Sequence, residues 1–217
     1  MTKPFAPRST PLIILGAGGH AAVVIDAAQS AGWPIRAVLD DDPSSTKGLR
    51  ALDLERTGPI SMLPDLLAAN ADAVVHPAVG DNDVRDKWLD MIEKVGGRSA
   101  TVIHPSAVVA RSTIVKPGCF IAAGAVVNPR ASIGRGCIIN TAAVVEHDCI
   151  IGPYTHVAPR SVLGGHVQVG SHALIGIGST VRPGVTVGDR ATLGVGAVAV
   201  NDIPADVTAL GCPARPR

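Results

Sequence analysis

The chain has 217 residues, of which 47% are hydrophobic and 17% are charged. Because an average soluble domain has about 25% charged residues, much of this surface must be uncharged or covered by other subunits. Lysine and arginine together number 19 against 18 acidic residues, and the aromatic residues are two Phe, two Trp and one Tyr. This charge balance and the shortage of aromatic rings argue against a nucleic acid or an anionic membrane as a partner.

The sequence also bears on the cellular compartment. No run of 18 apolar residues that could span a membrane occurs, and the apolar run at residues 12–15 is too short for a secretory signal. The four cysteines form no C-x-x-C pair, which fits a reducing compartment and argues against a zinc knuckle or a disulfide framework. We therefore expect a cytoplasmic protein without membrane insertion and without a metal.

Residues 1–100 alternate between short apolar strands and helical segments. The pattern predicts six elements, which are strands at 12–15, 35–39 and 73–79 and helices at 21–32, 61–70 and 83–95. Alternating strands and helices are typical of a parallel sheet covered by helices. We expect a small Rossmann-like α/β domain in this part of the chain.

A glycine-rich turn, G-A-G-G-H, joins the first predicted strand to the first helix. Such a turn presents backbone N–H groups and a helix N-terminus to a phosphate, and an acidic residue after the second strand can hydrogen-bond a ribose. This pattern is present in Gly16, Gly18 and Gly19 with Asp40 or Asp41. The alternative interpretation is a tight turn that needs small residues and binds no nucleotide. Because the domain is too short for the two halves of a dinucleotide site, a mononucleotide fits better than NAD.

After residue 100 the sequence repeats with a period of six. Sixteen consecutive positions spaced six apart, from Ile103 to Leu193, are aliphatic, and a row of small, uncharged residues stands two positions earlier. Side chains two apart on a strand share a face, so both rows point inward, and the glycines and prolines just beyond them mark turns. This pattern predicts a parallel β-helix of five to six coils. Cys119, Cys137 and Cys149 fall in the small row, where core packing is expected rather than nucleophilic chemistry.

The motifs GAGGHA, LDDD, AVGDNDVR and NTAAVVEHDCIIGPYTHVAP, with the tail GCPA, resemble the sugar-nucleotide and sialic acid acetyltransferase family of hexapeptide-repeat acyltransferases. The resemblance covers about residues 11–215 and includes the bacterial UDP-4-amino-sugar and GDP-perosamine N-acetyltransferases. It implies a nucleotide-sugar-binding domain at 1–100, a left-handed β-helix at 101–200 and a tail at 201–217 that contacts CoA. It also implies a homotrimer whose active sites lie between subunits, with acetyl-CoA as cosubstrate in a groove between β-helices.

Transfer of an acetyl group by direct attack on a thioester needs a base, and histidine is the side chain whose ordinary pKa lies near neutral pH. His147 and Asp148 stand at the corner of their hexad and should project out of the packed interior. A carboxylate beside an imidazole can fix its tautomer and stabilise its charged form. On the residues alone a solvated corner is the alternative, whereas the resemblance implies that His147 is the general base and Asp148 its partner.

The resemblance implies further residues that bind each of the two substrates. On the nucleotide-sugar side it implies His20, next to the glycine turn, whose alternative is a solvated helix residue. Gly80 follows the third predicted strand, and Asn82 and Arg85 could contact the diphosphate. The alternative interpretation is that Asn82 caps a helix and Arg85 is solvated.

On the acetyl-CoA side, His156 matches a family position near the acetyl group or CoA. Gly165, one coil beyond His147, could bring a backbone N–H to an oxyanion. Pro213 and Ala214 resemble a segment that contacts the far end of CoA, and Asn140 is expected to support the loop under the site. The remaining histidines are interpreted as structural, and they are His76, His104, His166 and His172.

Three alternative functions were weighed. A zinc enzyme resembling the γ-class carbonic anhydrases is disfavoured by the histidine spacing, and a nonenzymatic solenoid is disfavoured by the mixed outward rows. The third alternative is O-acetylation of sialic acid or a related sugar hydroxyl. We favour N-acetylation of the 4-amino group of a UDP- or GDP-linked 4-amino-4,6-dideoxy sugar, of the kind built for bacterial O-antigen, because a hydroxyl needs stronger activation than an amine.

Overall fold

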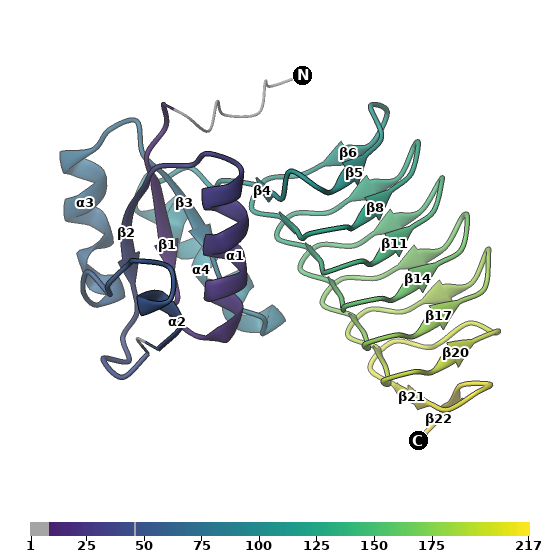
Figure 1. Ribbon diagram of the computed structural model, residues 1–217. Coiled ribbons are helices and arrows are strands. Elements are labelled where there is room, and N and C mark those ends of the chain that lie inside the picture. The colour runs from purple at the N-terminus through teal and green to yellow at the C-terminus, as the bar shows by residue number, and fades with distance from the viewer. Residues whose placement is uncertain (1–8, 46) are drawn as a thin grey trace. The chain divides into compact units, whose positions relative to one another are not determined.

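A computed structural model describes residues 9–45 and 47–217 and divides into two compact units, Met1–Pro105 and Ser106–Arg217 (Figure 1). The predicted fold, a small parallel-sheet domain with helices followed by a parallel β-helix, is confirmed. Every helix in the described part of the chain is too short or too polar to cross a membrane.

The first unit is built on a three-stranded parallel sheet in the order β2-β1-β3. These strands are β1 (Leu12–Leu15), β2 (Ile35–Leu39) and β3 (Val74–Pro77). All four residues of β1 are fully buried, as expected for the central strand of a parallel sheet that is covered on both faces. The helices are α1 (Gly19–Ser30), α2 (Lys47–Arg50), α3 (Leu63–Ala69) and α4 (Asn82–Lys94), with a 3₁₀ turn η1 (Ile60–Met62).

Helix α1 shows how the sequence positions the glycine turn. Its buried residues Ala21, Val24, Ile25 and Ala28 recur at the three- and four-residue spacing of one helix face. The helix begins at Gly19, two residues before the predicted start, because Gly18 already serves as the N-cap with an extended backbone. The turn is therefore part of the helix N-terminus, where backbone N–H groups have no partner within the helix.

Two-residue strands follow one another every six residues, and each from β4 to β19 ends on the predicted aliphatic row. They are β4 (Val102–Ile103), which belongs to the first unit, and then β5 (Val108–Val109), β6 (Ile114–Val115), β7 (Phe120–Ile121), β8 (Val126–Val127), β9 (Ser132–Ile133), β10 (Ile138–Ile139), β11 (Val144–Val145), β12 (Ile150–Ile151), β13 (His156–Val157), β14 (Val162–Leu163), β15 (Gln168–Val169), β16 (Leu174–Ile175), β17 (Thr180–Val181), β18 (Thr186–Val187), β19 (Thr192–Leu193) and β20 (Val198–Ala199).

Three parallel sheets form the sides of the β-helix. In the second unit their orders are β7-β10-β13-β16-β19-β21, β5-β8-β11-β14-β17-β20 and β6-β9-β12-β15-β18. Each strand from β5 to β17 pairs with the strand eighteen residues further on, as Val144 does with Val162. The tail continues the first of these sheets, because β21 (Thr208–Leu210) pairs with β19 and then forms an antiparallel ladder with β22 (Arg215–Pro216).

The interior is filled by the two inward rows. The aliphatic row from Ile121 to Leu193 is buried, and so is the row two positions earlier from Cys119 to Ala191. The thiols of the three cysteines in this row donate to backbone carbonyls fifteen residues ahead, at 3.0, 3.1 and 3.2 Å. Burial raises the pKa of the Cys149 thiol to about 11, so this group stays protonated near neutral pH.

The corners of the coils depend on two backbone features, a close approach to the next coil and a left-handed conformation. At Gly152, directly after the aliphatic row, an added Cβ would lie 2.5 Å from the carbonyl carbon of Gly170, so glycine is needed for the close approach of the next coil. The left-handed backbone falls two residues later, at fourteen successive corners from Gly118 to Gly196. Eight of these are not glycine, and they include Asp148 at φ 61° and His166 at φ 60°.

Candidate active site

The residues predicted to bind a nucleotide meet at the carboxyl ends of the three strands in the first unit. The Gly16 N–H donates to the Leu39 carbonyl at 2.7 Å, and the Ala78 N–H donates to the Leu15 carbonyl at 2.7 Å, so the turns after the three strands are tied together. Gly16 has φ 103°, and a Cβ there would lie 2.9 Å from the Ala78 carbonyl oxygen. This turn therefore requires glycine for its backbone as well as for space.

Asp40 holds the glycine turn in place. One carboxylate oxygen accepts from the Ala17 N–H at 2.7 Å, and the other accepts from the Asp42 N–H at 2.8 Å. Gly18 and Gly19 are exposed at the N-terminus of α1, and a Cβ on either would meet nothing within 4 Å. The turn thus presents an open backbone surface, as binding of a phosphate at a helix N-terminus requires.

Asp41 borders a pocket of about 330 Å³ within the first unit. Its carboxylate accepts from the Ile60 N–H at 2.9 Å, which fixes the side chain at the pocket edge. The other lining residues are mainly apolar, and they are Ile60, Ser61, Leu63, Pro64, Met91 and Val95. A mostly apolar cavity with one acidic group at its edge can hold a flat, partly polar ring.

Arg85 organises the loop after β3. Only 1% of Arg85 is exposed, and its guanidinium donates to the carbonyls of Val79, Gly80 and Asp81 at 3.1–3.2 Å and to the Asn82 side-chain oxygen at 2.7 Å. Asp81, rather than Asn82, caps α4. The buried cation therefore shapes the segment from Val79 to Asn82, and it does not have the solvated position that was the alternative for it.

Two histidines are held neutral beside this loop. Burial, and to a smaller degree the nearby Arg85 charge, lowers the pKa of His20 to about 4. His76 is buried and its Nδ1 donates to the Ala100 carbonyl at 2.9 Å. Burial, and to a smaller degree the nearby His20 and Arg85, lowers its pKa to about 4 as well. Both rings are therefore uncharged near neutral pH, and the His20 side chain near the strand ends is a neutral imidazole.

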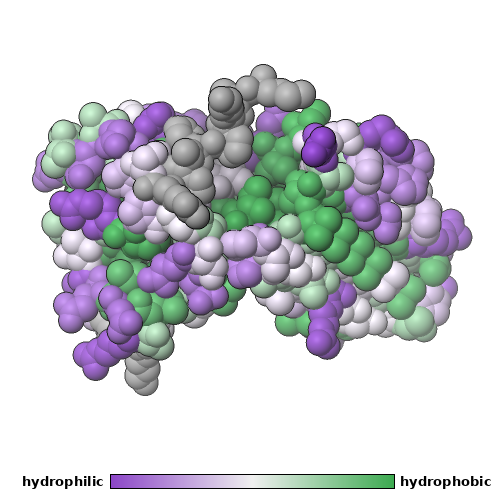
Figure 2. Space-filling view, turned by 45° about the horizontal axis from the view of Figure 1, so that its top comes forward, coloured by the Kyte–Doolittle hydropathy of each residue, from purple (hydrophilic) through white to green (hydrophobic). Residues whose placement is uncertain are grey.

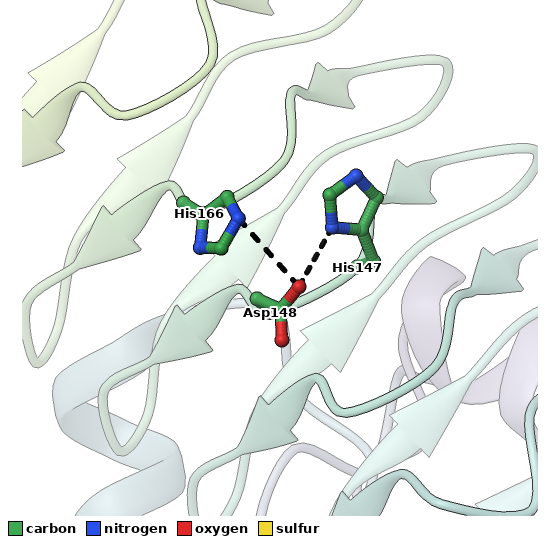
Figure 3. A group of neighbouring side chains, drawn as sticks. All are labelled: His147, Asp148 and His166. Carbon is green, nitrogen blue, oxygen red and sulfur yellow. Dashed lines mark hydrogen bonds and ion pairs between the residues drawn. The ribbon is translucent and has the colours of Figure 1, made fainter.

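In the second unit, His147 and Asp148 lie at the corner between β11 and β12 (Figure 3). The His147 Nδ1 is 2.7 Å from the Asp148 Oδ2. Because an ionised carboxylate only accepts, Nδ1 carries the proton, and Nε2 of the neutral ring is the unprotonated nitrogen. The His147 side chain is 47% exposed, so Nε2 can meet a substrate. This is the arrangement of a general base with its orienting carboxylate.

Arg130 is a second partner of the Asp148 carboxylate. Its Nε and Nη2 donate to the two carboxylate oxygens, each at 2.7 Å, in a bidentate pair. These bonds, and after them the bond to His147, keep the pKa of Asp148 well below its usual range. Asp148 is therefore ionised throughout the neutral range and is held by both Arg130 and His147.

His166 joins this cluster from the next coil. Its Nε2 lies 3.7 Å from the Asp148 Oδ2, and its ring meets that of His147 edge to face, with centroids 5.3 Å apart. From the sequence, His166 is interpreted as structural, and Arg130 is predicted only as one of several outward cations that could meet the CoA phosphates. The available signal was the coil length, because Arg130 precedes Asp148 by eighteen residues and His166 follows it by eighteen.

Gly165 leaves the space that the His147 ring occupies. A Cβ on Gly165 would lie 2.7 Å from Cε1 and 2.8 Å from Nε2 of His147. No left-handed backbone is involved, so glycine is needed here for room alone. The expected neighbour one coil beyond His147 is thus in contact with the ring.

His156 and the tail lie elsewhere in the second unit. His156, in β13, accepts at Nε2 from the Asn140 Nδ2 at 3.0 Å, an orientation set by Asn140 Oδ1 accepting from the Thr141 N–H at 2.8 Å. The His156 Nδ1 therefore carries the proton in the neutral ring. Ala214 is buried and donates its N–H to the Val198 carbonyl at 2.8 Å, whereas Pro213 is exposed.

Three side chains at the corner carry atoms that can bind a metal ion. His147, Asp148 and His166 offer ligand atoms that all lie within 4.8 Å of one another. However, Arg130 donates to both carboxylate oxygens, so a positive charge already occupies the place beside Asp148 that a cation would need. The cluster fits a network of paired charges better than a metal centre.

A β-helix of hexapeptide repeats with a His–Asp pair at one corner defines a hexapeptide-repeat transferase. The family described as bacterial transferase hexapeptide (six repeats) matches residues 130–165, which include Arg130, His147 and Asp148, and the PglD N-terminal domain family matches residues 11–92. A curated relative from Schizosaccharomyces pombe, named as an acetyltransferase, is 50% identical over 42 residues, which are 19% of this chain. The match spans only 20% of that relative's own length.

Solved structures match almost the whole chain. PerB from Caulobacter crescentus, in complex with CoA and GDP-perosamine, is 38% identical with a TM-score of 0.89, over 96% of this chain and 98% of its own. The acetyltransferase domain of PglB from Neisseria gonorrhoeae, in complex with acetyl coenzyme A, is 34% identical with a TM-score of 0.87, over 95% and 98%. WeeI from Acinetobacter baumannii is 26% identical with a TM-score of 0.83, over 96% and 100%. The chain belongs to the sugar-nucleotide acetyltransferase family.

The neutral His20 and His76 predict a pH-dependent stability of the first unit. An unfolded histidine takes up a proton below about pH 6.5, whereas these two resist it down to about pH 4 when folded. Their contribution is present above about pH 6.5 and is lost as the pH falls toward 4, by about 2 kcal/mol for each ring at pH 5. Urea unfolding at neutral and acidic pH, followed by the fluorescence of Trp33 and Trp88, measures it.

The matched variant for this prediction is His76→Asn, which keeps a donor near the position of Nδ1 but cannot be protonated. The variant should lose less stability than the parent between neutral pH and pH 5. An equal loss in both proteins would show that His76 is not a source of the acid sensitivity.

Gly165→Ala should displace the His147 ring while the fold survives. The backbone suits alanine, and the half-exposed His147 side chain can rotate away from the new methyl group. We expect acetyl transfer, followed as release of free CoA, to fall at least about tenfold, because a displaced base loses part of the roughly 10²–10⁴-fold that a positioned base contributes. The thermal unfolding midpoint should move by only a few degrees. An unchanged rate would show that the ring needs no room at this position.

Proposed function

We propose that this protein transfers the acetyl group of acetyl-CoA to the 4-amino group of a nucleotide-linked 4-amino-4,6-dideoxy sugar. The observation that carries the proposal is the His147–Asp148 pair, in which an exposed imidazole presents an unprotonated Nε2. The pair lies in a chain 38% identical to an enzyme whose structure contains CoA and GDP-perosamine. A base of this kind is what acyl transfer to an amine requires.

The reaction needs no covalent enzyme intermediate. The sugar nitrogen attacks the thioester carbonyl carbon and forms a tetrahedral intermediate, and Nε2 of His147 accepts the proton that the nitrogen loses. The Asp148 carboxylate stabilises the resulting imidazolium through Nδ1. The intermediate then collapses with cleavage of the carbon–sulfur bond, and the imidazolium returns its proton to the leaving thiolate. The products are the N-acetylated sugar nucleotide and free CoA.

The remaining predicted residues divide between the two substrates. We assign the glycine turn, His20 and the loop organised by Arg85 to the nucleotide sugar, with the pocket beside Asp41 as the place for its nucleoside. We assign Gly165 and His156 to the acetyl group, with Pro213 and Ala214 toward the far end of CoA. The Gly165 N–H is the proposed donor to the oxyanion of the tetrahedral intermediate.

We further propose that three copies of the chain assemble around an outward face of the β-helix. The outward residues of successive strands β5, β8, β11 and β14 are all valine, namely Val108, Val126, Val144 and Val162, and Val108 is 62% exposed. Figure 2 shows apolar residues gathered into contiguous surface patches. A continuous aliphatic column is costly to leave in water, and a partner covering β11 would lie beside His147. This assembly also accounts for the low content of charged residues.

The assembly predicts a particle of three 22.0 kDa chains in sedimentation equilibrium. Val162→Asp places a charge at the end of the aliphatic column and should shift the particle toward single chains. A parent protein that sediments as a single chain would exclude the assembly.

Both proposed substrates are soluble, charged metabolites, so we place the reaction in the cytoplasm. A nucleotide-linked N-acetylated amino sugar is the form in which a glycosyltransferase can use it, which fits a step in the building of bacterial O-antigen or a related glycan.

The test of the proposed function is release of free CoA from acetyl-CoA with a panel of UDP- and GDP-linked 4-amino-4,6-dideoxy sugars beside a free sialic acid. Turnover with one nucleotide-linked amine is expected and would identify both the base and the sugar. Turnover with sialic acid alone would move the function to O-acetylation, and no turnover with any acceptor would overturn the proposal.

Variants of the pair test the mechanism. With the active acceptor, His147→Ala should lower turnover by about 10²–10⁴-fold, because proton transfer then has no positioned base. Asp148→Asn should cost less, since the imidazole is retained. Near-parental turnover of His147→Ala would show that the amine reaches the thioester already deprotonated and that His147 only positions it.

A further inference from the structure

Arg130 bonds the carboxylate of Asp148, which in turn bonds the proposed base His147. It comes from the preceding coil and stands at the same left-handed corner as Asp148, with φ 64°. The two corners are eighteen residues apart, so coil stacking brings their side chains together without any loop. The result is a bidentate pair in which Nε and Nη2 donate to the two carboxylate oxygens, at 2.7 Å each.

This pair changes what Asp148 does to His147. A lone carboxylate beside an imidazole favours the charged ring, which cannot act as a base. A guanidinium bonded to the same carboxylate places a compensating positive charge near the ring and reduces that effect. The bidentate geometry also fixes the carboxylate plane, so Oδ2 stays directed at Nδ1 of His147.

Other charged and titratable groups face the cluster as well. His166 from the following coil lies 3.7 Å from Asp148, and Glu146 precedes His147 in the chain. Cys149 follows Asp148, but its thiol points into the interior and stays protonated. Arg130 differs from these because it alone donates two hydrogen bonds to the carboxylate among the described contacts of Asp148.

We propose that Arg130 is a positioning residue for acetyl transfer, which anchors Asp148 against His147 and offsets its charge so that His147 keeps Nε2 free of a proton at neutral pH. The inference rests on the proposed function of His147 as the base. Arg130 acts through Asp148 and has no contact of its own with the His147 ring among the described interactions.

Two substitutions separate charge from geometry. Arg130→Lys keeps a positive charge but loses the two-pronged donor, and Arg130→Asn removes both. Asparagine tolerates the left-handed backbone better than most residues, so the corner should persist. Arg160→Asn is the matched control, because Arg160 is another exposed arginine at a left-handed corner, with φ 59°.

The first readout is the titration of the His147 ring, followed by NMR of histidine labelled at Cε1 and assigned by its loss in His147→Ala. This readout needs no substrate. In Arg130→Asn the midpoint should move upward by about 0.5–1 pH unit, the size expected for losing one nearby charge in solvent. Arg130→Lys and Arg160→Asn should leave the midpoint near that of the parent.

The second readout is the pH profile of kcat/KM with the active acceptor. For Arg130→Asn, the acidic limb should move upward by the same amount, with a several-fold lower rate at neutral pH that is largely regained at higher pH. An unmoved midpoint in Arg130→Asn would overturn the inference even if acetyl transfer is demonstrated. A moved midpoint in a protein that acetylates none of the acceptors would keep the charge coupling and reject the proposed function.

Discussion

Parallel pairing of each coil with the next is the constraint on which the second unit depends. A strand bonds to the strand eighteen residues further on, so side chains stand in columns along the β-helix, and each residue has fixed neighbours one coil before and one coil after. The interior columns accept only aliphatic and small residues. Chemistry is left to the corners, where Arg130, Asp148 and His166 occupy one column and His147 stands beside it.

The two units handle charge in opposite ways. At the β-helix corner, Asp148 is partly exposed and its charge is balanced by direct partners. In the first unit, Arg85 is buried and donates to backbone carbonyls and to the Asn82 side-chain oxygen, while burial lowers the pKa of His20 and His76 so that both rings stay neutral. The corner can therefore exchange protons with a bound substrate, whereas the loop after β3 keeps a shape that does not depend on pH near neutrality.

The repeat was predictable because each six-residue unit has the same sequence pattern, which is one aliphatic and one small inward residue. The neighbouring pair His147 and Asp148 was predictable for the same reason, since both lie in one unit. Predicting that Arg130 and His166 join the pair requires knowing which residues stack in one column, and this relation between coils is not visible in any local pattern. In addition, non-glycine residues occupy several left-handed corners, where the sequence shows no turn residue. The burial of Arg85 and the bond from Ala17 to Asp40 depend on how three strand ends come together, which periodicity does not encode.

The column geometry also sets which changes of length the β-helix can absorb. Removing or duplicating eighteen residues would return every later side chain to its own face, so the structure could become shorter or longer by whole coils. A change of six residues would keep the inward rows intact but rotate everything beyond it onto the adjacent face, which would detach Asp148 from Arg130 if it fell between them. Insertions or deletions of six residues therefore preserve the packing of the core. Only insertions or deletions of eighteen residues also preserve the contacts between corner side chains of neighbouring coils.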